Sequence, residues 1–160
     1  MTILIALTLS IGLLAVVATW VFLGPLAALN VQIWQAFIAW AAFYHCGGKG
    51  TGMKNTMIGM IFGAVVGALS VMLAGQLGAL GSFAAPVAVG IGAGAIVLAA
   101  HIPLLATIPA SVYGFASIAG LILLKGLSPV DALLPTIISI LLGAVFGWLS
   151  ESLGGKMAKA

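Results

Sequence analysis

The chain has 160 residues, of which 64% are hydrophobic and 4% are charged, with five Lys or Arg against two Asp or Glu and a formal net charge of +3. A globular domain carries about 25% charged residues, so this composition excludes a soluble fold and indicates an all-α integral membrane protein with several spans. Five scattered lysines suit loop anchors better than a nucleic-acid surface, so we expect the lipid bilayer and no nucleic acid as a partner.

Three spans are predicted in the first half of the chain. Residues 3–23 are long enough to cross about 30 Å of hydrocarbon, and Gly24 and Pro25 then break the helix. Residues 26–46 predict a second, more polar span. Residues 47–55, with the sequence GGKGTGMKN, predict a glycine-rich loop that lies outside the hydrocarbon or lines water. The third span is expected over residues 56–77.

Three further spans are predicted in the second half, over residues 83–100, 104–124 and 132–150. Pro109 is expected to kink the fifth span, because proline lacks the amide hydrogen and its ring clashes with the preceding turn. Pro135 is expected in the first turn of the sixth span, where proline is tolerated. Residues 151–160 predict a polar tail with lysines. Five spans are the alternative, with residues 83–124 forming one span and a re-entrant piece.

The lysines orient the six-span arrangement, which has both termini on one side of the membrane. With cytoplasmic termini, only Lys125 falls outside, and the other lysines fall inside, in agreement with the positive-inside rule. The inner lysines are Lys49, Lys54, Lys156 and Lys159.

A repeat links the two halves of the chain. Residues 56–70, TMIGMIFGAVVGALS, return 80 residues later (136 − 56) as TIISILLGAVFGWLS. Both copies have a small residue at every fourth position, which predicts a helix-packing seam made of Gly59, Gly63, Gly67, Ser139, Gly143 and Gly147. We therefore expect two three-helix repeats, residues 1–80 and 81–160, with the second copy inverted because three is odd. Inverted repeats are typical of channels and transporters. Chance recurrence of small residues is the alternative.

A family resemblance covers most of the chain. The stretch WQAFIAWAAFYHCGGKGTGMKNTMIGMIFGAVVG (residues 34–67), the segment IPASVYG (residues 108–114) and the closing LLGAVFG (residues 141–147) resemble an uncharacterised bacterial inner-membrane family, DUF1097. The resemblance implies a bacterial plasma-membrane protein with no assigned chemistry. An aromatic-rich span followed by a glycine-rich helix is also faintly similar to fusaric-acid-resistance-type exporters.

Polar residues inside apolar spans are the candidate pathway residues. Unsatisfied polar groups in hydrocarbon cost several kcal/mol, so these should face a partner or water. A displacement of 76 residues pairs Gln35 with Ser111, and we expect this pair near a constriction. Interhelical hydrogen bonding, an aromatic belt and, for His45, a surface position are the alternatives. The candidates are Trp34, Gln35, Tyr44, His45, Ser111, Tyr113 and Ser117.

The few ionisable residues bear on the function. Two histidines and two carboxylates near span ends form no catalytic constellation, and the single Cys46 excludes an intrachain disulfide and a thiolate metal cluster, so we expect no enzyme, no cofactor and no metal. No charge lies deep in a span, which favours a facilitative path for a small neutral polar solute such as urea, ammonia or a short amide. A non-transporting assembly protein and an exporter of small organic compounds are the alternatives, and we expect a homo-oligomer.

Overall fold

The computed structural model describes residues 1–159, and this part of the chain is helical without strands. Ala160 of the expected tail lies outside the described residues. The segments long and apolar enough to cross a membrane are α1, α3, η2 with α4, α5 and α6, and α2 is too short. The elements are α1 (Ile3–Leu23), η1 (Ala27–Leu29), α2 (Ile33–His45), α3 (Lys49–Gln76), η2 (Gly78–Phe83), α4 (Ala84–Ala99), η3 (Pro103–Leu105), α5 (Ile108–Lys125) and α6 (Pro129–Lys159).

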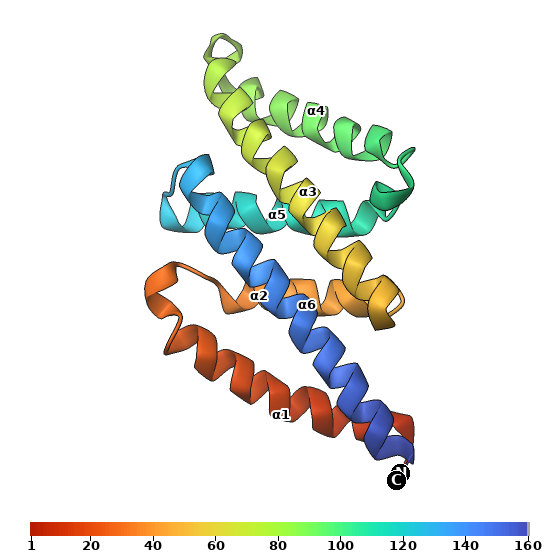
Figure 1. The fold of residues 1–160 in the computed structure, drawn as a ribbon. Coiled ribbons are helices and arrows are strands. Elements are labelled where there is room, and N and C mark those ends of the chain that lie inside the picture. Colours follow the sequence, from red (N-terminus) through yellow and green to blue (C-terminus); the bar gives the residue numbers. More distant parts are fainter. Residues whose placement is uncertain (160) are drawn as a thin grey trace.

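Successive α-helices run in opposite directions, and both termini lie at the same end of the bundle (Figure 1). The outward faces are apolar: Leu13, Val16 and Leu123 are 68%, 70% and 83% exposed. Such a surface needs hydrocarbon around it rather than water, because large contiguous apolar surfaces are rare on soluble monomers. Together with the five apolar spans, it makes this a multi-pass membrane protein.

Two long helices, α3 and α6, lie side by side and run in opposite directions through the bundle, and the other helices pack against them (Figure 1). Helix α6 packs against α1, α2 and α3, and α3 packs against α4, α5 and α6. Met60 of α3 and Ile140 of α6 are fully buried in one core cluster with Ile118 and Leu121 of α5. The centre of the molecule is therefore built by α2, α3, α5 and α6, while α1 and α4 lie at the two edges.

The small residues of α3 and α6 lie where backbones meet. A Cβ added to Gly63 would overlap the carbonyl of Ser111 in α5, and one added to Gly143 would overlap the carbonyl of Ala36 in α2. Missing side chains thus allow direct contact between helix backbones. The remaining seam contacts are Gly59 with Ala110, Gly67 with Ile118, Gly147 with Phe43, and Ser139, whose Oγ accepts the backbone N–H of Gln32 at 3.0 Å.

The glycine-rich segment is a correction to the sequence analysis. The irregular part is the turn through Lys49, with φ of 93° at Gly47, 66° at Gly48 and 56° at Lys49, and residues 50–55 form the first turns of α3. Gly52 lies within α3, and its lack of a side chain lets the helix approach the backbone carbonyl of Phe43, where a Cβ would be only 2.9 Å from the oxygen. Likewise, the tail expected after residue 150 is helical and belongs to α6 as far as Lys159.

The expected second span and both proline assignments also need correction. Helix α2 begins only at Ile33, because Asn30 takes a left-handed conformation (φ 56°) after the short turn η1. Pro109 lies in the first turn of α5, so it causes no break there, whereas Pro135 lies inside α6, which already begins at Pro129. Five segments are long and apolar enough to cross a membrane, the number in the five-span alternative, but residues 83–124 contribute to two of them and α2 is the helix that is too short.

Candidate functional site

The side chain of Gln35 lies at the meeting point of three helices. It is fully buried in the first turn of α2, and its amide nitrogen donates to the carbonyl oxygen of Ser117 in α5 at 2.9 Å and to Oγ1 of Thr136 in α6 at 3.0 Å. Two of the predicted pathway residues, Gln35 and Ser117, are therefore neighbours. Ser111, which we expected opposite Gln35, makes no hydrogen bond with it.

Four buried polar atoms have no hydrogen-bond partner within the described residues: Oε1 of Gln35, Oγ1 of Thr56, Oγ of Ser111 and Oγ of Ser117. All four residues are at most 1% exposed and lie on α2, α3 and α5. A buried hydroxyl or amide without a partner costs about 1–3 kcal/mol. The buried interior of the bundle therefore retains unused hydrogen-bonding capacity on these three helices.

The sequence analysis missed Thr136, which contacts Gln35, and Thr56, a second buried threonine on α3. Both are fully buried, and they occupy the first position of the two repeated stretches, 80 residues apart. The repeat was the signal that could have found them, because a hydroxyl that recurs at equivalent positions of two apolar helices is a candidate for an interior contact. Their environments differ, since Thr136 accepts the Gln35 amide and Thr56 has no partner among the described residues.

Tyr44 belongs to a second polar cluster, centred on Ser150 of α6. The Ser150 hydroxyl lies 2.8 Å from the Tyr44 hydroxyl and accepts the indole N–H of Trp40 at 2.9 Å. From α1, the Ser10 hydroxyl donates to the Ser150 carbonyl oxygen at 2.9 Å. These contacts join α1, α2 and α6, and they hold the Tyr44 ring on the α1 side of α2, away from Gln35.

The remaining candidates lie apart from Gln35. The Nδ1 atom of His45 is 3.0 Å from the hydroxyl of Tyr113, an exposed contact between the end of α2 and α5. The Trp34 ring packs beside Gly120, where an added Cβ would lie 3.0 Å from its Cη2 atom. The hollows lined by α1, α2, α6 and the start of α3, and the one between α4 and α5, do not include Gln35, Ser111 or Ser117 in their linings. Gln35, Ser117 and Thr136 are all fully buried, so the centre around Gln35 is closed to the surface.

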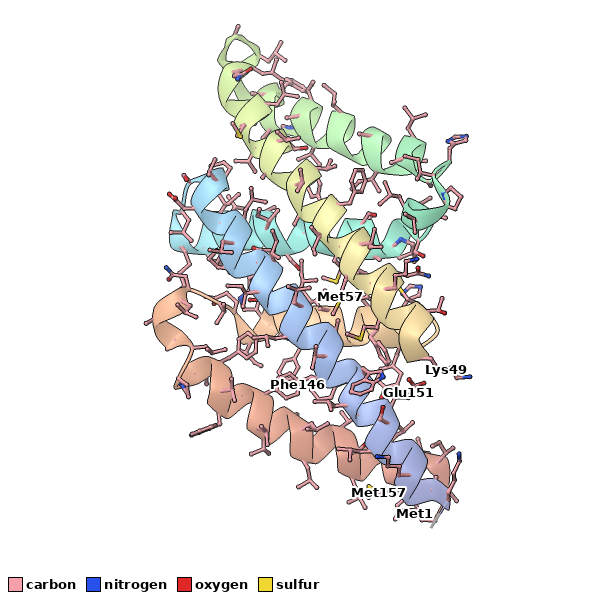
Figure 2. The ribbon with its side chains drawn as sticks, viewed as in Figure 1. Met1, Lys49, Met57, Phe146, Glu151 and Met157 are labelled. Atoms are coloured by element: carbon pink, nitrogen blue, oxygen red, sulfur yellow. The ribbon has the colours of Figure 1, made fainter. Side chains whose placement is uncertain are left out.

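Charged groups gather at the end of the bundle that carries both termini. A carboxylate oxygen of Glu151 in α6 accepts the backbone N–H of Lys49 at the start of α3, at 2.6 Å, and Figure 2 shows the two residues side by side. A carboxylate at a helix N-terminus is favoured by the helix dipole and satisfies an otherwise unpaired amide. Within residues 1–159, no three His, Cys, Asp or Glu side chains come together as a metal site.

The apolar outer surface, the packed helices and the small polar centre define a multi-pass helical membrane protein with a sparsely polar interior. The family described as "Protein of unknown function (DUF1097)" matches residues 8–155, and the chain belongs to this family. No curated protein and no solved structure matches the chain.

Proposed function

We propose that this protein is a channel or facilitative transporter for a small neutral polar solute of the urea, ammonia or short-amide class. The observation that carries the proposal is the fully buried carboxamide of Gln35. Its oxygen has no hydrogen-bond partner, and neither has the hydroxyl of Ser117, the residue whose backbone carbonyl accepts the Gln35 amide. Amide and hydroxyl groups replace the hydration of a neutral solute without needing a counter-charge. Because the centre is closed to the surface, the arrangement corresponds to a closed state, and passage requires α2 and α5 to separate.

An architecture of two inverted repeats is part of the proposal, and the packing of the helices supports it. Exchanging α1 with α4, α2 with α5 and α3 with α6 leaves the main packing pairs unchanged: α1 on α6 becomes α4 on α3, and α2 on α6 becomes α5 on α3. The same exchange relates the turns η1 and η3, which precede the central helices α2 and α5. A pathway near the pseudo-two-fold axis follows from such a design.

The seam contacts refine the register between the repeats. Gly63 and Gly143 are equivalent in the repeat, and they contact Ser111 and Ala36, respectively. These contacts therefore pair Ala36 of α2 with Ser111 of α5, an offset of 75 residues in the sequence (111 − 36) rather than 76. In this register Gln35 corresponds to Ala110, and Ser111 corresponds to Ala36. The carboxamide therefore has no counterpart in the second repeat, which favours one polar site in each chain instead of a symmetric pair.

Location, orientation and assembly complete the proposal. We place the protein in the bacterial plasma membrane with cytoplasmic termini, supported by the four lysines at the end of the bundle that carries the termini and only Lys125 at the other. A non-enzymatic role is supported by the sparse ionisable groups. A homo-oligomer is supported by the open outer face of α4, where an added Cβ on Gly90 or Gly94 would meet no atom within 4 Å.

Stopped-flow light scattering on proteoliposomes tests the transport proposal. Urea and then glycerol gradients are applied to the wild type, to Gln35→Leu and to Gln76→Leu, a matched control at the exposed end of α3. We expect urea permeability above that of empty liposomes and a roughly tenfold loss in Gln35→Leu, the equivalent of about 1.4 kcal/mol in the barrier. Wild-type permeability no greater than that of empty liposomes for either solute would defeat the proposal as stated.

A non-transporting assembly role is the second candidate, favoured by the closed packing around Gln35. In that case the same liposomes show no solute flux, and the exposed α4 face mediates contacts between subunits. Substitution of Gly90 or Gly94 by Leu then changes the oligomeric state measured by light scattering in detergent, whereas Gly155→Leu, a control on α6 with equally open space, leaves it unchanged.

A further inference from the structure

Three neighbouring hollows lie along α1, α2, α6 and the start of α3, and Tyr44 lines all of them. The hollow nearest the termini has a volume of about 680 Å³ and includes Leu7, and it continues through Leu7 and Tyr44 into one of about 460 Å³. That second hollow continues through Ile11 and Tyr44 into one of about 260 Å³ between α1 and α2, which Phe37 and Ala41 also line. The three hollows therefore follow one another along α1, and together they are called the groove below.

The polarity of the groove changes along its length. The hollow near the termini is lined by Lys49, Lys156 and Lys159 with one carboxylate, that of Glu151, which already accepts the backbone N–H of Lys49. Positive charge therefore exceeds negative charge three to one. The other two hollows are lined mainly by aliphatic and aromatic side chains. Figure 2 shows Lys49, Glu151, Met157 and Met1 gathered at this end of the bundle.

We propose that this groove binds one molecule of anionic phospholipid, with its phosphate near the three lysines and an acyl chain along α1 and α2 past Tyr44. Cationic side chains at the membrane surface attract anionic headgroups with about 1 kcal/mol per Lys or Arg. Trp148 and Tyr44 line the hollow where the lysines give way to apolar side chains, the depth that amphipathic aromatic rings prefer. The bilayer itself supplies the ligand.

The other edge of the bundle provides an internal comparison. A groove of about 150 Å³ between α4 and α5 is lined by Val89, Ala93, Ile96, Val112 and Phe115, and it has no lysine among these residues. A lipid chain can occupy this groove as annular lipid does, but nothing in its lining selects a headgroup. Anionic selectivity is therefore confined to the groove of α1, α2 and α6.

Native mass spectrometry of the full chain in dodecyl maltoside tests the headgroup assignment, using phosphatidylglycerol and phosphatidylcholine with identical acyl chains. We expect at least about fivefold preferential retention of phosphatidylglycerol, the equivalent of 1 kcal/mol. The triple variant Lys49→Gln, Lys156→Gln, Lys159→Gln loses the preference, and Lys125→Gln at the opposite end keeps it. Equal retention of both lipids, or an unchanged preference in the triple variant, overturns the proposal.

Two further arms test the acyl chain. Ala41→Phe fills the groove between α1 and α2 and lowers retention of phosphatidylglycerol, whereas Ala93→Phe, the matched substitution between α4 and α5, does not. If Ala41→Phe leaves the retention of phosphatidylglycerol unchanged, the result contradicts an acyl chain in this groove. Glycerol phosphate, which carries the headgroup without chains, is expected not to raise the melting temperature. A rise equal to that with phosphatidylglycerol would mean that the lysines bind a soluble anion.

Discussion

A methyl group added to Gly63 should separate two helices. Its Cβ would overlap the backbone carbonyl of Ser111, and backbone, unlike a flexible side chain, cannot move aside without shifting α5. Overpacking costs about 1–3 kcal/mol, with the upper end expected against backbone. Replacing a helical glycine by alanine by itself stabilises by about 0.5–1 kcal/mol. The balance for Gly63→Ala is a loss of about 2 kcal/mol.

Gly94 offers the opposite case on the same kind of helix. An added Cβ there meets no atom within 4 Å, so Gly94→Ala keeps only the favourable helix term of about 0.5–1 kcal/mol. Gly143→Ala, which overlaps the Ala36 carbonyl, should behave like Gly63→Ala. The free energy of unfolding is measured in mixed detergent with increasing SDS, followed by far-ultraviolet circular dichroism.

The difference in sign makes the comparison decisive. Gly63→Ala and Gly143→Ala should unfold at lower SDS than the wild type, and Gly94→Ala at the same or higher SDS. If Gly63→Ala were as stable as Gly94→Ala, the close approach of α3 and α5 would be wrong, and with it the packing of the centre around Gln35.

Two smaller predictions concern single hydrogen-bonding groups. Thr136→Val removes an acceptor of the Gln35 amide and should lower the free energy of unfolding by about 0.6 kcal/mol, the average for such bonds in membrane proteins. Thr56→Val makes the same change of shape at a hydroxyl without a partner, and it should be neutral or stabilising in the same SDS titration. Equal losses at both positions would contradict the hydrogen-bond assignment. Glu151→Ala leaves the Lys49 amide at the start of α3 uncapped and should lower the free energy of unfolding by about 1 kcal/mol. Ser152→Ala is the neighbouring control, and an unchanged stability of Glu151→Ala would contradict the capping contact.

Long apolar segments were predictable because their ends coincide with strong local signals. Helix α1 spans Ile3–Leu23 as expected, since Gly24 and Pro25 follow it, and α4 differs from the expected residues 83–100 by one residue at each end. The composition alone identified a multi-pass helical membrane protein, and the quoted motifs identified the family.

Glycine caused the main errors, because the same residue ends helices in one context and packs them in another. The segment after Cys46 contains four glycines within six residues and reads as a loop, yet Gly50 and Gly52 are helical, and positive φ is confined to Gly47, Gly48 and Lys49. Contact with Phe43 decides the role of Gly52, and such tertiary contact has no local signature.

The candidate site was predictable in part for a similar reason. Polarity inside an apolar span singled out Gln35 and Ser117, which are neighbours across α2 and α5. The partner of Gln35 on α6, Thr136, was missed because a lone threonine in a helix ordinarily bonds its own backbone. The pairing of Gln35 with Ser111 relied on aligning the two halves of the sequence with a gap, which leaves the register of α2 against α5 uncertain from sequence. In the proposed repeat, the glycine contacts favour a register that differs by one residue.

The shortness of α2 has a consequence for the shape of the surrounding bilayer. The 13 residues of α2 span about 20 Å, roughly 10 Å less than the thickness of the hydrocarbon core. The segment before α2 is exposed and irregular, and exposed irregular backbone does not occur in the hydrocarbon, where its polar groups would lack hydrogen bonds. The water interface must therefore dip toward the start of α2, a local hydrophobic mismatch. Gln35 is the third residue of that helix, so it lies near this thinned side of the bilayer, and most of the hydrocarbon lies between Gln35 and the end that carries the termini.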